Sequence, residues 1–118
     1  MNVLLFKNYL AGGTIPAHTL VKLTAAGTVV AASAPADLVV GVSGELAVVA
    51  GERVDVAHVG IAPVVAGEAV SLGAAVTADA SGRAAAAAGG GKRAAGIALD
   101  AASGAGDVIR ILLAPHLA

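Results

Sequence analysis

Short apolar stretches separated by glycine-containing turns recur along the whole chain. The stretches 20–24 and 28–31 flank the turn Ala25-Ala26-Gly27, which predicts a β-hairpin. Residues 53–59 alternate apolar and polar side chains, as a half-buried antiparallel strand does. The pattern predicts an all-β fold, a small β-barrel or sandwich that forms a single domain over residues 1–118.

The same pattern of glycines and apolar residues occurs twice, at an offset of 55 residues and without a gap. The coincident positions are Gly12 with Gly67, Gly27 with Gly82, Gly41 with Gly96, Gly51 with Gly106, Val21 with Val76, Val42 with Ile97, and Ala50-Gly51-Glu52 with Ala105-Gly106-Asp107. A recurring glycine marks backbone that needs a positive φ or a close approach. We therefore expect two pseudo-repeated halves, residues 11–65 and 66–118. Chance is the alternative, because Ala, Gly and Val dominate the chain.

The second half carries poorer strand residues than the first. Five alanines at 84–88 favour a helix by propensity alone. They fall where the repeat places the strand of Val29 and Val30, so we predict a strand over residues 83–88. A single helical turn at 98–103 is a weaker expectation.

The N-terminal segment lies outside the repeated pattern. It holds the densest group of large apolar side chains: Val3, Leu4, Leu5, Phe6 and Tyr9. One interpretation is a first strand that closes the barrel, and the other is an arm, residues 1–10, that lies on a neighbouring subunit. On the second interpretation these five residues are the candidate contacts with a partner.

Composition excludes several classes of function. The chain has 118 residues, a net charge of −1, 13% charged residues and 2% aromatic residues, which argues against a nucleic-acid partner. Cysteine is absent, so disulfides and cysteine-ligated zinc are excluded. No apolar run reaches the ~18 residues of a membrane helix, and no signal peptide is recognised, so we expect neither a membrane nor secretion. So few charges leave much apolar surface, which indicates burial by partners.

No catalytic or metal-binding pattern is found. His18, His58 and His116 lack the spacing of a metal site, and no serine sits in a G-x-S-x-G turn. Gly89-Gly90-Gly91-Lys92-Arg93 fails the phosphate-loop pattern, because Ala86 replaces its first glycine and Arg93 its Ser or Thr. We expect no enzymatic activity, no cofactor and no metal.

The order of these motifs resembles the capsid cement, or head decoration, proteins of tailed bacteriophages. The resemblance rests on residues 11–24, on 38–42 followed by 50–56, on 76–84, and on the ending 96–98, 106–108 and 111–115. It implies a compact β protein that binds the outside of an icosahedral head and clamps neighbouring major capsid subunits.

From this resemblance we expect a structural virion protein on the capsid exterior, made in the host cytoplasm. Its partners would be the major capsid protein and further copies of itself, as a trimer or alternatively a dimer. Val3, Leu4, Leu5, Phe6 and Tyr9 would then be capsid or subunit contacts, and deleting residues 2–9 should leave a folded protein that binds heads weakly. The alternatives are a surface-displayed receptor- or carbohydrate-binding module and a small hydrolase.

Overall fold

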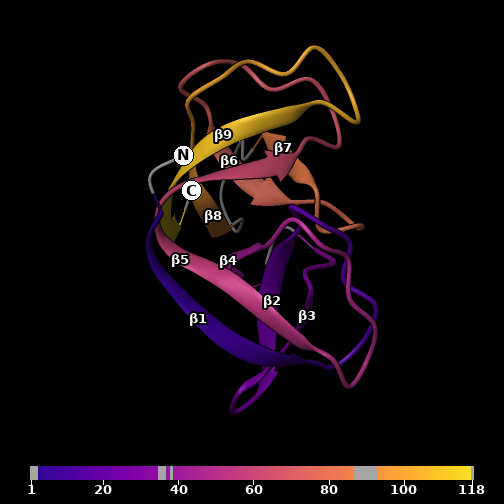
Figure 1. The fold of residues 1–118 in the computed structure, drawn as a ribbon. Helices are drawn as coiled ribbons and strands as arrows, with labels where there is room; N and C mark the ends of the chain where they lie inside the picture. The colour runs from indigo at the N-terminus through magenta and orange to yellow at the C-terminus, as the bar shows by residue number, and fades with distance from the viewer. Residues whose placement is uncertain (1–2, 35–36, 38, 87–92, 118) are drawn as a thin grey trace.

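The computed structural model describes residues 3–34, 37, 39–86 and 93–117, with the backbone alone at 3–6, 59, 93–94 and 114–117. Nine strands and no helix make up this part of the chain (Figure 1). The strands are β1 (Val3–Ala11), β2 (Leu20–Ala25), β3 (Thr28–Ala31), β4 (Val39–Ser43), β5 (Arg53–Val65), β6 (Ala75–Ala78), β7 (Ala84–Ala86), β8 (Arg93–Ala98) and β9 (Val108–Leu117). The predicted all-β class is confirmed.

Strands β1 to β5 form a closed five-stranded barrel. They are ordered β1-β3-β2-β4-β5, and antiparallel pairing of β1 with β5 closes the ring. Strands β9, β8, β6 and β7 continue from β5 into a second sheet, and a parallel bridge from Ala84 to Ala66 brings its far edge back to the end of β5. Figure 1 shows the barrel below, the second sheet above, and β5 passing from one to the other.

The strand pairings repeat at the 55-residue offset. Matching pairs are Leu20–Val42 and Ala75–Ile97, Lys22–Val30 and Thr77–Ala85, Val42–Ala57 and Ile97–Leu112, and Tyr9–Val54 and Val64–Ile109. The same fold element is therefore used twice. We call β1 to β4 with residues 53–57 the first unit, and residues 58–65 with β6 to β9 the second unit.

Strand β5 belongs to both units, since its second half corresponds to β1. The units begin at β1 and in the middle of β5, earlier than the predicted boundaries at residues 11 and 66. Residues 3–10, for which a strand and an arm were both considered, pair with β5 from Val3 to Leu10. The segment is thus a strand of its own domain, and a contact with a neighbouring subunit stays a prediction.

The interiors of the two units are built from equivalent positions. The first core contains Tyr9, Ala11, Ile15, Val21, Val29, Val54 and Val56, and the second contains Val64, Ala66, Val70, Val76, Ala84, Ile109 and Ile111. Each member of the second set stands 55 residues after its counterpart. Apolar side chains recur at these places because each strand turns alternate residues to the inside.

The second unit packs against the outer face of the first. Leu20, Val42 and Ala57 lie on neighbouring strands and turn away from the first barrel, because the adjacent residues Val21 and Val56 point into it. All three are buried in the same cluster as the second core. We name them the junction row.

Two glycines allow neighbouring strands to approach closely. A Cβ added at Gly41 would overlap the carbonyl oxygen of Ala57, and one at Gly96 would overlap that of Leu112. The two positions match across the repeat. This explains the coincidence of Gly41 and Gly96 by close approach of the backbone.

The alanine run forms a strand as far as it is described. Strand β7 covers Ala84–Ala86, where Ala84 takes the place of Val29 in the core. The helical turn expected at 98–103 is wrong, since these residues end β8 and then form bends and a bridge from Ala102 to Val70. The glycine-rich loop at 89–92 lies outside the described residues.

Candidate functional site

His58, the first residue of the second unit, has a structural role through its contacts with the first unit. The Tyr9 hydroxyl lies 2.8 Å from His58 Nε2, and His58 Nδ1 lies 2.7 Å from the carbonyl oxygen of Val40. A carbonyl only accepts, so Nδ1 donates to Val40, and in the neutral ring Nε2 then accepts from the Tyr9 hydroxyl. The two rings also meet edge to face, with centroids 5.4 Å apart. Both ring nitrogens are therefore engaged.

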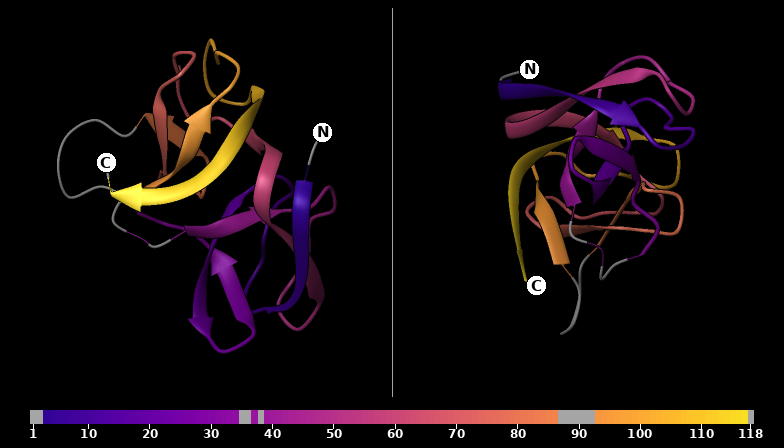
Figure 2. Two further views of the ribbon diagram at one scale, coloured as in Figure 1. Left: turned by 90° about the vertical axis from the view of Figure 1, so that its left-hand side faces the viewer. Right: turned by 90° about the horizontal axis from the view of Figure 1, so that it is seen from below.

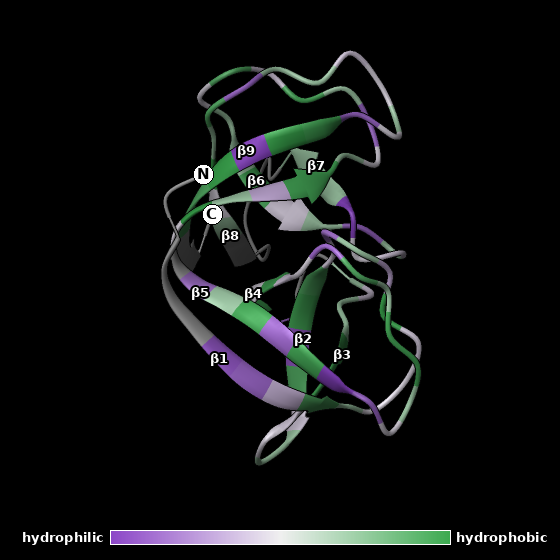
Figure 3. Ribbon diagram, in the orientation of Figure 1, coloured by the Kyte–Doolittle hydropathy of each residue, from purple (hydrophilic) through white to green (hydrophobic). Residues whose placement is uncertain are grey.

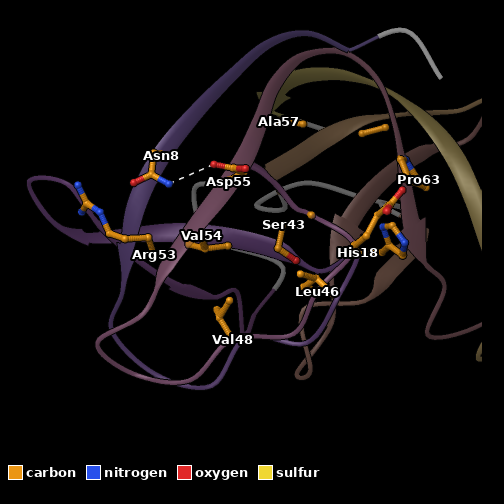
Figure 4. Close-up of a pocket in the computed structure, with 13 residues that line it drawn as sticks. Asn8, His18, Ser43, Leu46, Val48, Arg53, Val54, Asp55, Ala57 and Pro63 are labelled. Carbon is orange, nitrogen blue, oxygen red and sulfur yellow. Dashed lines mark hydrogen bonds between the residues drawn. The ribbon is translucent and has the colours of Figure 1, made fainter.

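A cavity of about 410 Å³ lies beside the junction of the two units (Figure 4). Its lining comes from β1, β4, β5, the loop between β1 and β2 and the loop that follows β4: Asn8, His18, Ser43, Gly44, Glu45, Leu46, Val48, Arg53, Val54, Asp55, Ala57, Ala62 and Pro63. Two of these residues are joined by a hydrogen bond, which Asn8 donates to Asp55 at 3.1 Å. A cavity of this size could accommodate a small molecule.

The serine in this cavity holds the backbone. Ser43 Oγ donates to the carbonyl of Pro16 at 2.8 Å and accepts from the N–H of Thr19 at 2.9 Å. A nucleophilic serine would instead be hydrogen-bonded to a base. No three His, Asp or Glu side chains in the described residues are grouped to hold a metal ion.

His18 is the least satisfied residue in the cavity wall. Its φ of 53° is left-handed, at the position that Gly73 takes with a φ of 82° in the second unit. Its Nδ1 is buried without a hydrogen-bond partner. In the described part of the chain no hydrogen bond joins the His18 side chain to Ser43 or Asp55, so the three do not form a catalytic triad. Of His116, the third histidine, only the backbone is described.

The carboxylates serve turns and strand edges. Asp107 accepts from the hydroxyl and the N–H of Ser103, and these bonds lower its pKa. Asp37 accepts from the N–H of Ser33, which lowers its pKa, and Lys22 adds to the effect at 3.0 Å. Arg110 donates two side-chain hydrogen bonds to Asp100 and lowers the pKa of that carboxyl to about 2. Each shift has a structural cause.

Large apolar side chains are exposed at several places on the surface. They are Leu10, Leu23, Leu46, Val49, Leu72, Ile97, Val108 and Leu112. Leu46 is 80% exposed in the loop after β4. Figure 3 also shows most of β9 coloured as hydrophobic. A surface of this kind suits contact with other proteins.

Two of the exposed side chains, Ile97 and Leu112, form part of one face together with the half-buried Ala75. Ala75 pairs with Ile97 and Ile97 pairs with Leu112, so the three side chains form a row across β6, β8 and β9. This open row corresponds by position to the junction row. The sequence pattern did not reveal this row, although the 55-residue offset already aligned Ile97 with Val42.

The predicted contact residues are placed only in part. Val3, Leu4, Leu5 and Phe6 lie in β1, with the backbone alone described. The ring of Tyr9 is buried in its own domain and Lys7 Nζ lies 5.6 Å from its centroid. Tyr9 therefore offers little surface to a partner, and a contact role for all five residues stays a prediction.

In the described part of the chain no helix is long and apolar enough to cross a membrane. Sugars usually stack on an exposed aromatic ring. Among the described side chains the Tyr9 ring is buried and so is not available for such stacking. Together the fold and the surface define a small all-β protein whose described residues show binding surface and no assembled catalytic centre.

Comparison with known proteins identifies the family. The chain belongs to the phage cement protein family, whose model matches residues 9–113. The head fiber gp8.5 N base of bacteriophage phi29 has a similar fold, with a TM-score of 0.74 and 17% sequence identity over 93% of each chain. None of the curated proteins matches the chain. The protein is thus a structural protein of phage capsids, as its sequence motifs indicated.

Proposed function

We propose that this chain binds the outer surface of a phage head and cements neighbouring major capsid subunits. Membership of the phage cement family is the observation that carries the proposal. The exposed apolar side chains and the low charge support it, since a clamp needs contact area and shape rather than chemistry.

The protein would be made in the host cytoplasm and act on the capsid exterior as a homo-oligomer, a trimer or alternatively a dimer. Multivalent attachment lets weak contacts add up to stable binding. Val3, Leu4, Leu5 and Phe6 on β1 are the proposed capsid or subunit contacts, together with Tyr9 where a partner could reach its edge. The phi29 protein of similar fold is itself a head fiber base.

Undecorated heads provide the test. Purified protein is mixed with heads and pelleted, and the heat stability of the heads is measured with and without it. We expect co-pelleting and a raised inactivation temperature. Heads that neither bind the protein nor gain stability would contradict the proposal. Binding to host cells or glycans without binding to heads would favour the receptor- or carbohydrate-binding alternative.

Single Val3→Ser, Leu4→Ser, Leu5→Ser and Phe6→Ser variants then locate the contact. A variant that keeps its β spectrum but binds heads at least about tenfold more weakly marks a contact residue, since burial of such a side chain contributes ~1.5–3 kcal/mol. Ala101→Ser, at an exposed position between β8 and β9, is the control. Unchanged binding in all four would place the contact elsewhere.

A further inference from the structure

The contact between the two units is one-sided. The N–H of Leu20, in the junction row, donates to the carbonyl of Gly82 at 2.8 Å. At the 55-residue offset the counterparts of Leu20 and Gly82 are Ala75 and Gly27. If each unit contacted the other in the same way, the N–H of Ala75 would donate to the carbonyl of Gly27. Instead the carbonyl of Gly27 accepts from Leu10 at 2.8 Å within the first unit. The first unit therefore contributes a face, and the second contributes the tip of a hairpin.

The face that the first unit uses is left open on the second. Val42 and Ala57 are buried under the second unit. Their counterparts Ile97 and Leu112 are 36% and 41% exposed. The open row is also built from larger side chains than those of Val42 and Ala57.

The hairpin tip that the second unit uses is left open on the first. In the second unit Ala78 and Gly82 are buried at the junction. Their counterparts are Leu23, which is 47% exposed, and Gly27, which is also exposed. Figures 1 and 2 show the β2–β3 turn projecting at the end of the molecule remote from the second unit. We name residues 23–27 the free tip.

The free tip has the backbone shape that the junction requires. Gly27 and Gly82 share a φ of 75°. A Cβ at Gly82 would lie 2.6 Å from Thr19 Cγ2, so the junction accepts a glycine at this place. The free tip, Thr24-Ala25-Ala26-Gly27, carries small side chains around the same glycine.

We infer that copies of this chain associate head to tail, with the free tip of one copy seated on the open row of the next. The contact repeats between chains what the junction row and Gly82 already do within each chain. Leu23 meets Ile97 and Leu112. The carbonyl of Gly27, which already accepts from Leu10, takes a second hydrogen bond from the N–H of Ala75, because a carbonyl oxygen has two lone pairs. A second copy is the fitting occupant because every chain carries both halves of the contact. Head-to-tail contacts of this kind give a closed ring or an open chain.

This inference rests on the self-association in the proposed function and not on capsid binding. Its first test is sedimentation equilibrium of the full chain without heads. We expect a molar mass several times 11.1 kDa for the unsubstituted protein. Leu23→Glu at the tip and Ile97→Glu on the row should each weaken association by at least about a hundredfold, because an unpaired charge in an apolar contact is strongly unfavourable. Leu46→Glu is the control and should leave the mass unchanged.

Mixing the variants tests the polarity of the contact. The Leu23→Glu variant keeps an unaltered open row, and the Ile97→Glu variant keeps an unaltered free tip. An equimolar mixture should therefore form one-to-one pairs and nothing larger. The unused tip and row both carry a carboxylate and repel each other. Circular dichroism of each variant checks its fold, and Leu112→Glu replaces Ile97→Glu should the latter unfold.

Three results would overturn the inference. The unsubstituted chain could be a monomer in solution, the tip and row variants could associate as it does, or the mixture could fail to pair. A monomer whose tip and row variants lose head binding would assign these surfaces to the capsid protein instead. Normal association without any head binding would support this inference and contradict the proposed function.

Discussion

Gly82 and Gly27 have the same backbone conformation in very different surroundings. Both have a φ of 75°, but a Cβ at Gly82 would meet Thr19, Leu20 and Ala32, whereas one at Gly27 would meet nothing within 4 Å. The pair separates the cost of an unfavourable φ from the cost of crowding at the junction between the units.

Gly82→Ala is expected to destabilise the protein much more than Gly27→Ala. The left-handed conformation costs an alanine about 1–2 kcal/mol at either place, and crowding adds about 1–3 kcal/mol at Gly82 alone. Urea unfolding of dilute protein measures both. Equal losses would mean that the Gly82 turn does not pack against the first unit.

The Tyr9 hydroxyl should contribute to stability through His58. Tyr9→Phe leaves the ring in the core but removes the donor to His58 Nε2, at an expected cost of about 1 kcal/mol. Asn8→Ala removes an exposed bond to Asp55 and should cost less. Thermal unfolding of both variants gives the comparison, and a neutral Tyr9→Phe would contradict the hydrogen bond.

Stability should depend on pH through Asp100. Its pKa is lowered from 3.8 to about 2 by hydrogen bonds from Arg110. A lowered folded-state pKa stabilises the folded form above pH 3.8, and this stabilisation is lost as the pH falls towards 2. Unfolding temperatures of the unsubstituted protein and Asp100→Asn should therefore differ at pH 6 and converge near pH 2. The difference should also shrink in high salt, because the pair is exposed. A difference in unfolding temperature that stays constant with pH would mean that the ion pair of Asp100 and Arg110 is not its cause.

Removal of β1 should abolish the fold. The sequence alone led us to expect that deletion of residues 2–9 leaves a folded protein, but β1 pairs with β5 and places Tyr9 and Ala11 in the first core. Without it the barrel is open along both β3 and β5. Circular dichroism and thermal melting of the truncated chain should show no cooperative transition. A cooperative transition would mean that the segment is dispensable, as an arm would be.

Much of the fold could be predicted because its main constraints are local. Gly41 and Gly96 reflect close approach of strands, and Gly51 and Gly106 reflect positive φ, so the same residue recurs at the same offset. The match of Tyr9 with Val64 was hidden, since the only shared requirement there is an apolar side chain that fills a core.

The open row could not be predicted from the repeat. Val42 and Ile97 align well, and either residue suits a buried or a half-exposed strand. Their different exposure follows from the order of the units: the second unit covers the outer face of the first, and none of the described residues covers the equivalent face of the second. The difference in exposure depends on how the two units pack, and the residue types at these positions do not reveal it.

The strand shared by the two units also has a mechanical consequence. A capsid that swells or is pressurised from within pulls its surface proteins apart along the shell. In most two-unit proteins that tension falls on a linker or on a non-covalent interface. Here β5 runs unbroken from the first barrel into the second sheet, with its first half paired to β1 and β4 and its second half paired to β9. Tension between the units is therefore carried by peptide bonds, and extension requires strands to be sheared from a sheet rather than peeled from its edge.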